Sequence, residues 1–186
     1  MNLRLFIAVD LSEEQKEQLL ELQKRLMQDI NGVKWVNATG LHITLKFLGE
    51  VENIPEEPWK PLLKAINNFK PFKVSFQGIG AFPSLRKPRV IWSGVNEGKE
   101  QLRELSRSID NVLKEHGFSP EKKEIIPHVT LGRIRKNEKG ISLTPVVGKH
   151  EEFYTPNSDV NYINLYQSIL SPKGASYKSL QKIYFE

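Results

Sequence analysis

The stretch LHITLKFLGE, residues 41–50, decides how this sequence is read, because its pattern returns in PHVTLGRI, residues 127–134. Each stretch contains, in order, a histidine, a β-branched apolar residue, a threonine and a leucine. Side chains on a β-strand alternate between its two faces. The histidine and threonine of each stretch therefore share one face, and the apolar residues take the other. Each strand is expected to anchor in the core of one lobe and to present an imidazole and a hydroxyl.

If the two strands lie near each other, His42, Thr44, His128 and Thr130 line one cleft. A neutral imidazole can take a proton from attacking water, and an imidazolium can give one to a leaving oxygen, because the unperturbed pKa of histidine is about 6.5. Each such transfer typically contributes about 10²–10⁴-fold in rate. The hydroxyls can hold the oxygens of a phosphate between the two bases. One histidine in a strand is more often structural or exposed, but the repeated context favours a catalytic pair for phosphate chemistry.

The other two histidines have simpler interpretations. His116 ends a helical stretch and is expected to interact with the helix dipole, and His150, beside two glutamates, is expected on the surface. Cysteine is absent, which excludes disulfides and thiolate zinc sites. Zinc at His42 and His128 has little support, because threonine is a poor ligand and no acidic residue shares the predicted face. We therefore expect no metal and no cofactor.

Length and composition describe one globular domain over residues 1–186, with 39% hydrophobic and 26% charged residues. The longest apolar run, Leu5 to Val9, is far shorter than the roughly 20 residues of a membrane span and too short for a secretory signal. The expected location is the cytoplasm, with no membrane partner. The net charge of +5 is compatible with an anionic partner such as RNA, without demanding one.

Periodicity predicts strand, helix, strand, strand in each half of the chain, and so two similar lobes that face each other. A strand over residues 3–9 precedes a capping box, in which the Ser12 hydroxyl caps a helix and the Gln15 side chain reaches back; this helix should run to about Ile30. Further helices are predicted within residues 55–68 and 99–116. The remaining predicted strands are VKWV (33–36), LHITLKFLGE (41–50), FKVSFQGIGAF (72–82), PRVIWSGV (88–95), HVTLGRI (128–134), YINLYQSIL (162–170) and SLQKIYFE (179–186).

At these residues the sequence resembles the RNA 2′,3′-cyclic phosphodiesterases, first described as 2′-5′ RNA ligases, of the two-histidine (2H) phosphoesterase superfamily. The defining motif, His-x-Thr-x, is matched twice, by HITL at 42–45 and HVTL at 128–131. The similarity covers nearly the whole chain. Other segments that resemble the family, in family order, are RLFIAVDL, VKWVNATGLHITLKFLGEV, GIGAFPS, PRVIWSGV and LYQSILSPKGASY.

The resemblance implies an α+β, bilobal fold, with two antiparallel sheets related by pseudo-two-fold symmetry around a central cleft and helices on the outside. It implies metal-independent hydrolysis of a terminal 2′,3′-cyclic phosphate on RNA to a 2′-phosphate. Carried onto this chain, His42 would be the general acid and His128 the general base, and Thr44 and Thr130 would bind the phosphate. Spacing alone does not distinguish the two histidines. The same groups would support the reverse reaction, 2′-5′ ligation.

Three neighbouring residues have two interpretations each. The family often has an arginine after the second motif, matched by Arg133, which would bind substrate; alternation places it opposite His128 unless a bulge at Gly132 re-aims it. Lys46 has the parity of His42 and either meets an RNA phosphate or is solvated. Phe47 has core parity, which favours packing over base stacking. The basic residues Arg86, Lys87 and Arg89, with Lys73 nearby, either grip RNA or form a solvated loop.

Other functions stay open at this point. The chain could be a phosphodiesterase for a small cyclic nucleotide or an ADP-ribose cyclic phosphate, or a ligase of tRNA halves. A protein of another class, a non-catalytic RNA- or nucleotide-binding module, would keep the cleft without turnover. The partners expected are RNA ends or cyclic-phosphate nucleotides, bound by a monomer.

Overall fold

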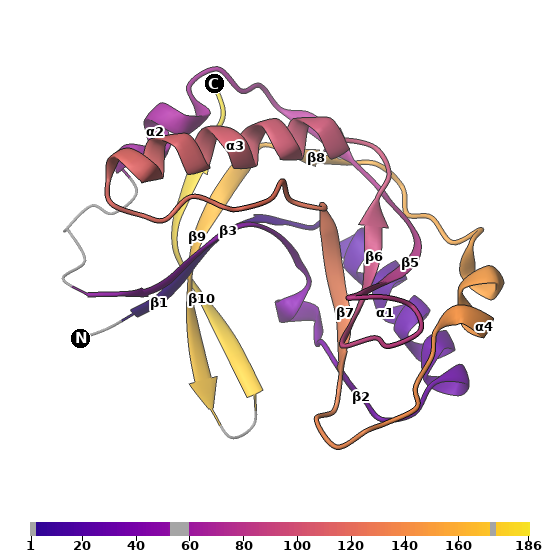
Figure 1. Ribbon diagram of the computed structural model, residues 1–186. Coiled ribbons are helices and arrows are strands. Elements are labelled where there is room, and N and C mark those ends of the chain that lie inside the picture. Colours follow the sequence, from indigo (N-terminus) through magenta and orange to yellow (C-terminus); the bar gives the residue numbers. More distant parts are fainter. Residues whose placement is uncertain (1–2, 53–59, 172–173) are drawn as a thin grey trace.

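The computed structural model of the chain describes residues 3–52, 60–171 and 174–186 (Figure 1). Its strands are β1 (Leu3–Asp10), β2 (Val33–Trp35), β3 (His42–Val51), β4 (Phe72–Val74), β5 (Phe76–Phe82), β6 (Val90–Val95), β7 (His128–Ile134), β8 (Ser158–Val160), β9 (Tyr162–Ser171) and β10 (Gly174–Tyr184). Its α-helices are α1 (Glu13–Asp29), α2 (Lys60–Ile66), α3 (Lys99–Glu115) and the short α4 (Thr144–Val147).

Two antiparallel sheets form the two lobes, as expected. Strands β10, β9, β1 and β3 make one sheet, and β7, β6 and β5, with β2 beside β7, make the other. The sheets meet edge to edge at one residue pair, Ile43 of β3 and Val129 of β7, which makes the eight strands continuous. The predicted bilobal α+β architecture with pseudo-two-fold symmetry is therefore confirmed.

The helices lie outside the sheets, and each long helix covers the sheet of the opposite half of the chain. Helix α1 follows β1 but packs on the other lobe, where the Gln23 side chain donates to the Leu131 carbonyl of β7 at 2.8 Å. Helix α3 follows β6 but packs behind β3, where the Ser106 hydroxyl donates to the Leu45 carbonyl at 2.8 Å. Figure 1 shows α3 across the top of the β1–β3 lobe and α1 behind β5, β6 and β7. This exchange joins the lobes.

Each of the two long helices buries one apolar stripe. In α1 these residues are Leu19, Leu22 and Leu26, followed by Ile30, and in α3 they are Leu102, Leu105, Ile109, Val112 and Leu113. Burial of such a side chain stabilises the fold by about 1.5–3 kcal/mol relative to exposure. The two stripes pack into one apolar core that continues behind both motif strands.

Two details of the predicted elements are wrong. Ser12 caps α1 by accepting from the Gln15 backbone N–H at 3.2 Å, but the Gln15 side chain does not reach back. It is buried and donates instead to the carbonyls of Val74 and Pro156, at 2.9 and 3.0 Å, so tertiary partners replace the second half of the capping box. The strand predicted over residues 72–82 is two strands, because the backbone at Ser75 pairs with residues 96 and 97 and breaks the ladder.

The helix predicted within residues 55–68 corresponds to α2 (Lys60–Ile66), and the part of the prediction that covers residues 55–59 lies outside the described parts of the chain. The predicted C-terminal strand pair is present as β9 and β10. Strand β10 begins at Gly174, earlier than expected, and pairs with β9 back to Ser171.

Candidate active site

The two motif strands lie side by side at the centre of the molecule. Ile43 and Val129, each the residue after a motif histidine, are fully buried and directly paired. Since the strands are antiparallel, His42 lies on the side of Thr130, and Thr44 lies on the side of His128. The alternation of side chains therefore brings the four motif residues to one place, as the repeat predicted.

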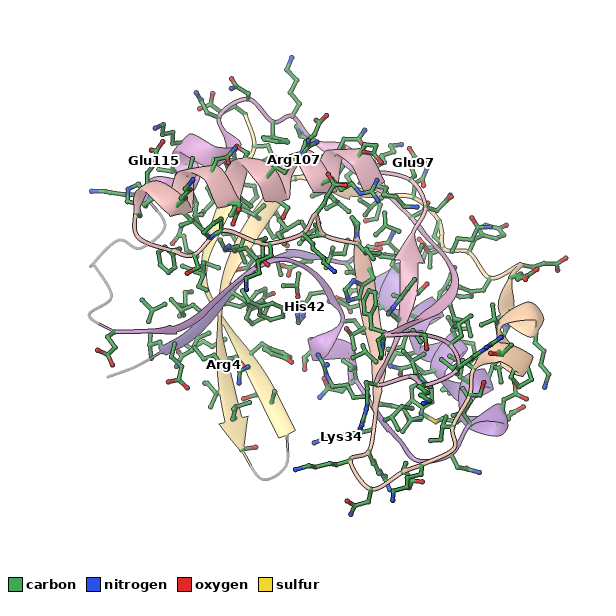
Figure 2. All side chains as sticks on the ribbon, viewed as in Figure 1. Arg4, Lys34, His42, Glu97, Arg107 and Glu115 are labelled. Atoms are coloured by element: carbon green, nitrogen blue, oxygen red, sulfur yellow. The ribbon has the colours of Figure 1, made fainter. Side chains whose placement is uncertain are left out.

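These four side chains line a cleft of about 760 Å³ between the lobes. Arg133 lines the same cleft, so all five candidate site residues are brought together. Other parts of its wall come from β1, from the end of β5, from the β9–β10 hairpin and from the segment before β7, and they include Arg4, Phe6, Phe82, Lys123 and Tyr177. Figure 2 shows His42 between the two lobes, with Arg4 on the same side of the molecule.

Each motif strand has a β-bulge directly after its threonine. In β3, Thr44 pairs with Ala8 and Lys46 with Ile7, which leaves Leu45 as the extra residue. In β7, Thr130 pairs with Trp92 and Gly132 with Ile91, which leaves Leu131 as the extra residue. A bulge inserts one residue and reverses the alternation of faces beyond it. The residues that follow each motif therefore point opposite to where simple alternation puts them.

The bulged leucines are held by buried polar side chains of the two exchanged helices. The Leu45 carbonyl accepts from the Ser106 hydroxyl of α3, and the Leu131 carbonyl accepts from the Gln23 amide of α1, both at 2.8 Å. The Leu131 carbonyl also accepts from the Val36 backbone N–H at 2.9 Å. The helices thus add side-chain hydrogen bonds to the backbone at the two places where the motif strands depart from regular pairing.

The bulge in β7 explains the position of Arg133. The predicted bulge at Gly132 lies one residue earlier, at Leu131, and it turns Arg133 toward the cleft that His128 faces. Arg133 is exposed and, among the described residues, forms no ion pair. Its guanidinium is free to meet an anion.

The bulge in β3 corrects the interpretation of Phe47, which occupies the position in β3 that Arg133 has in β7. Core packing was expected, but Phe47 is 63% exposed and lines the cleft. Its ring lies 6.1 Å from the ring of Phe6. An aromatic face is thereby open to a ligand, and the prediction of core parity is wrong because the bulge reverses the alternation.

The same bulge makes both interpretations of Lys46 wrong. Its side chain is 3% exposed and pairs with Asp110 of α3, and its Nζ also donates to the Ser119 carbonyl at 2.7 Å. Glu121 lies 3.6 Å away. Lys46 is thus neither solvated nor free for an RNA phosphate. It ties β3 to α3 and to the segment that leads into His128.

His42 is enclosed by aromatic rings. Phe6 lies 4.9 Å, Tyr177 5.1 Å and Tyr166 6.1 Å from its ring centroid. Burial lowers the pKa of His42 from 6.5 to about 4; Asp10 acts in the opposite direction, and His128 and Arg133 lower the pKa further. Without an anion in the cleft, the low-dielectric surroundings therefore favour the neutral imidazole.

His128 has a different partner. Its Nδ1 lies 2.6 Å from the Ile126 carbonyl. A carbonyl only accepts, so Nδ1 carries the proton, and Nε2 of the neutral ring keeps its lone pair. Burial lowers the pKa of His128, the carbonyl raises it, and Arg133 lowers it. Phe82 and Trp92 stand beside this ring at 5.0 and 5.9 Å.

The remaining candidates lie away from the cleft. His116 ends α3 with Nδ1 2.9 Å from the Val112 carbonyl, which confirms its place at the helix C-terminus. His150 is not a surface residue: it is 8% exposed, with Nε2 3.5 Å from Asp29 at the end of α1. Arg86, Lys87 and Arg89 are exposed on the loop between β5 and β6, while Lys73 lies on β4 in the separate two-stranded sheet.

Among the residues that the structure describes, no three His, Cys, Asp or Glu side chains are grouped in a way that could hold a metal ion. Within those same ranges, no helix has the length and apolar character needed to cross a membrane.

Sequence reasoning missed the aromatic and polar side chains that surround His42. Tyr166 stacks on Phe6 with ring centroids 5.3 Å apart, and its hydroxyl donates to Asp10 at 2.6 Å. The sequence does contain one indication of this polar cluster: strand alternation in YINLYQSIL puts Tyr162, Asn164 and Tyr166 on one face. Nothing in the sequence showed that this face would lie against the end of β1.

A family model for LigT-like phosphoesterases matches the chain twice, over residues 9–92 and 94–177. Each match contains one of the two histidine motifs. A curated relative, the RNA 2′,3′-cyclic phosphodiesterase of Archaeoglobus fulgidus, is 39% identical over 179 residues, which are 96% of this chain and 98% of that protein. The protein of the same name from Thermotoga maritima is 36% identical over 189 residues, covering 99% and 96%.

Solved structures are similar over the same length. The crystal structure of E. coli LigT complexed with 3′-AMP superposes with a TM-score of 0.78 at 25% identity, covering 100% of this chain and 99% of that one. The crystal structure of TT0787 of Thermus thermophilus gives a TM-score of 0.76 at 28% identity, covering 98% and 97%. The likeness thus includes both lobes and the cleft between them.

Proposed function

The chain belongs to the family of LigT-like phosphoesterases, and from this premise we propose that it hydrolyses the 2′,3′-cyclic phosphate at the end of an RNA strand to a 2′-phosphate. The observation that carries the proposal is the meeting of two His-x-Thr strands, one from each lobe, in a single cleft. Relatives that cover the chain almost end to end are RNA 2′,3′-cyclic phosphodiesterases, which supports the same reaction here.

In the proposed mechanism His128 is the general base. Its Nδ1 proton is directed at the Ile126 carbonyl, which leaves Nε2 free to take a proton from water. The water oxygen bonds to phosphorus as the bond from phosphorus to the ribose 3′ oxygen breaks. His42, the general acid, gives its proton to that leaving oxygen. The product is a 2′-phosphate and a 3′-hydroxyl, and proton exchange with solvent restores both imidazoles.

The other site residues position the phosphate. The Thr44 and Thr130 hydroxyls would donate to its non-bridging oxygens and hold phosphorus between the two imidazoles. The Arg133 guanidinium would balance the charge that grows on those oxygens. A bound anion would also raise the pKa of His42 from its low value, because an opposite charge favours the imidazolium.

The same groups support 2′-5′ ligation, in which a 5′-hydroxyl takes the place of water, bonds to phosphorus and displaces the 3′ oxygen, so that a 2′-5′ bond forms. A small cyclic nucleotide is the main alternative substrate, since a cleft of about 760 Å³ accepts one without an attached strand. We further propose that residues 1–186 form one bilobal domain that acts in the cytoplasm as a monomer. The helix exchange between the lobes supports the single domain.

Product analysis tests this function. The protein is incubated with a short oligonucleotide ending in a 2′,3′-cyclic phosphate and, separately, with a 2′,3′-cyclic mononucleotide. The expected product is a 2′-phosphate in both, at a higher kcat/KM for the oligonucleotide. A 3′-phosphate product would contradict the assigned leaving group. Binding of either compound without turnover would favour the non-catalytic module, and turnover of the mononucleotide alone would favour the small-molecule alternative.

A further inference from the structure

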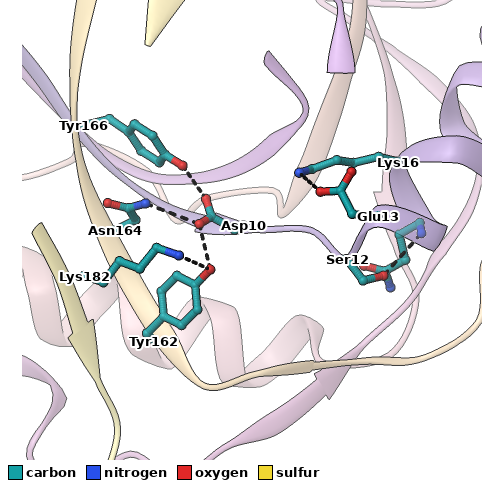
Figure 3. Close-up of polar contacts among 9 residues, drawn as sticks. Asp10, Ser12, Glu13, Lys16, Tyr162, Asn164, Tyr166 and Lys182 are labelled. Atoms are coloured by element: carbon teal, nitrogen blue, oxygen red, sulfur yellow. Dashed lines mark hydrogen bonds and ion pairs between the residues drawn. The ribbon is translucent and has the colours of Figure 1, made fainter. Parts of the chain in front are cut away.

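Asp10, the last residue of β1, lies directly opposite His42 in the β1–β3 ladder. Opposite residues in an antiparallel pair share a face, with Cβ atoms about 4.5–5.5 Å apart. The Asp10 carboxylate accepts three hydrogen bonds, from the Tyr166 hydroxyl at 2.6 Å, the Tyr162 hydroxyl at 2.9 Å and the Asn164 amide at 3.2 Å (Figure 3). Three donors from one face of β9 therefore fix the carboxylate beside the imidazole.

All three donors are neutral side chains, so none of them brings a positive charge to the carboxylate. Among the described residues, Asp10 forms no ion pair. The nearest lysine of the network, Lys182, donates to the Tyr162 hydroxyl at 3.1 Å and not to Asp10 (Figure 3). Burial, reinforced by Asp10, raises the pKa of Tyr162 and Tyr166, so both stay protonated donors.

The matching position in the other lobe carries no side chain. In the β6–β7 ladder the residue opposite His128 is Gly94. The charge that acts on His128 is the guanidinium of Arg133. The Nδ1 of His128 donates to the Ile126 carbonyl. The two motif histidines therefore share their sequence context but differ in the residue that lies opposite on the neighbouring strand. This residue is Asp10 for His42 and Gly94, which has no side chain, for His128.

Other charged and titratable groups surround this pair. His128 and Arg133 act on His42 across the cleft, Tyr177 packs edge-on against its ring, and Lys182 stands behind Tyr162. Glu121, Lys123 and Glu124 line the cleft from the segment before β7. Asp10 is the carboxylate that acts on His42, and it opposes the effects of burial, His128 and Arg133.

We propose that Asp10 is a positioning residue that supplies the counter-charge of the His42 imidazolium and so makes His42, rather than His128, the proton donor. The inference rests on the proposed function. The tyrosines and Asn164 hold the carboxylate in place, and Gly94 keeps the corresponding place beside His128 free of charge. The asymmetry of the reaction thus comes from residues outside the repeated motif.

An NMR titration of the four histidines tests the proposal without any substrate. The imidazole ¹H–¹³C signals are followed with pH in the wild type, Asp10→Asn and Asp10→Glu, both free and with inorganic phosphate. Removal of the charge should lower the titration midpoint of His42 by about one unit and leave His128 unchanged, because an opposite charge nearby shifts a pKa by roughly one to three units. Asp10→Glu should stay near the wild type. An unchanged His42 midpoint in Asp10→Asn overturns the proposal.

A reciprocal pair of variants covers the case in which Asp10→Asn does not fold. Gly94→Asp places a carboxylate opposite His128, and Gly94→Asn is its neutral match. The new Cβ would lie 3.3 Å from Trp92, so the indole must move slightly in both variants. The midpoint of His128 should be higher in Gly94→Asp than in Gly94→Asn. Equal midpoints would mean that a carboxylate at this ladder position does not control the imidazole, which contradicts the proposal.

Kinetics then separate this inference from the function on which it rests. With the cyclic-phosphate oligonucleotide, Asp10→Asn should lose about tenfold in kcat/KM, which corresponds to one pKa unit, and Asp10→Glu should recover most of the loss. An inactive wild type would defeat the proposed function, and the titration would still be readable. An active wild type with equal losses in Asp10→Asn and Asp10→Glu would instead reduce Asp10 to a structural role.

Discussion

His42 and His128 show how residues in the same sequence context are given different chemistry. One imidazole lies among Phe6, Tyr166 and Tyr177, with a carboxylate opposite. The other donates a hydrogen bond to a carbonyl and lies beside Arg133. A general acid and a general base need opposite protonation states at the same pH. In the proposed mechanism the surroundings of the two residues, and not the motif itself, would set this difference.

Removal of either imidazole is expected to stop most of the hydrolysis. His42→Ala and His128→Ala should each lower kcat/KM on the cyclic-phosphate oligonucleotide by about 10²-fold or more, since one proton transfer is lost in each. Circular dichroism should show an intact fold. His116→Ala, at the end of α3 and outside the cleft, is the matched control and should keep its activity. A motif variant with a near-normal rate would disprove the acid–base assignment.

The low pKa of His42 predicts acid sensitivity of the fold. The folded value is about 4, whereas an unfolded histidine titrates near 6.5, so the unfolded state takes up the proton first as the pH falls. The free energy of unfolding should therefore fall between pH 6.5 and 4, by up to about 3 kcal/mol from this group. His42→Gln should remove most of this loss.

Urea denaturation at several pH values measures this effect. His116→Gln is the control and should follow the wild type. The same pH dependence in His42→Gln and in the wild type would show that His42 is not held neutral by burial. His128, whose pKa is also lowered by burial, contributes in the same direction.

At the scale of elements, the two bulged strands are the feature that positions the site. Each bulge follows the motif threonine and turns one further side chain to the cleft, Phe47 in β3 and Arg133 in β7. Each is held from behind by a polar side chain of a helix that belongs to the other half of the chain. The geometry of the cleft therefore depends on residues that lie behind the strands and do not line it.

Gln23 should accordingly matter for stability. Its amide donates to the carbonyls of Val36 and Leu131, both at 2.8 Å, and Gln23→Leu would remove both bonds. A buried polar group left unpaired costs about 1–3 kcal/mol, so unfolding in urea should show a loss of about 2 kcal/mol. The exposed Gln28→Leu on the same helix is the control and should change stability by less than about 0.5 kcal/mol. Equal effects of the two substitutions would contradict this role.

The bulges also mark the limit of prediction from the sequence. Strict alternation placed His42, Thr44, His128 and Thr130 correctly, because these residues lie before the extra leucines. Strict alternation failed for Lys46 and Phe47, because they lie beyond the extra leucine of β3, Leu45. A bulge depends on long-range partners such as Ser106, which simple periodicity does not include. The helices and the two-lobe order were predictable from apolar spacing, but the crossing of each helix to the opposite lobe was not.

At the scale of the whole molecule, the cleft gathers positive charge. Arg4, Lys123 and Arg133 line it, and within the described residues none of them forms an ion pair. Lys34 lies at the edge of the same opening, close to Gly174 of the β9–β10 hairpin. A Cβ atom built on Gly174 would be 3.4 Å from the Lys34 Nζ. Figure 2 shows Arg4 and Lys34 on the two sides of this opening. The distribution suits a strand of phosphates better than a single one.

Hydrolysis of an oligonucleotide should therefore weaken with salt. Single strands give a slope of about −0.7 per phosphate contact in a plot of log affinity against log salt, so three contacts predict about −2 for kcat/KM. A cyclic mononucleotide should give a shallower slope. Arg4→Gln should reduce the oligonucleotide slope by about 0.7, while Lys64→Gln, on α2 and paired with Glu115, should not. Identical slopes for the two substrates would exclude contacts beyond the reacting phosphate.

The single pair of residues that joins the two sheets has a mechanical consequence. Ile43 and Val129 lie at the centre of the molecule, and each motif imidazole belongs to the residue directly before one of them. If one lobe rocks against the other about this pair, displacement grows with distance from the axis. The outer rim, where Lys34 and the β9–β10 hairpin lie, then travels far, while the imidazoles stay almost still. Such a motion would widen the entrance for a strand without changing the spacing between the two motif imidazoles.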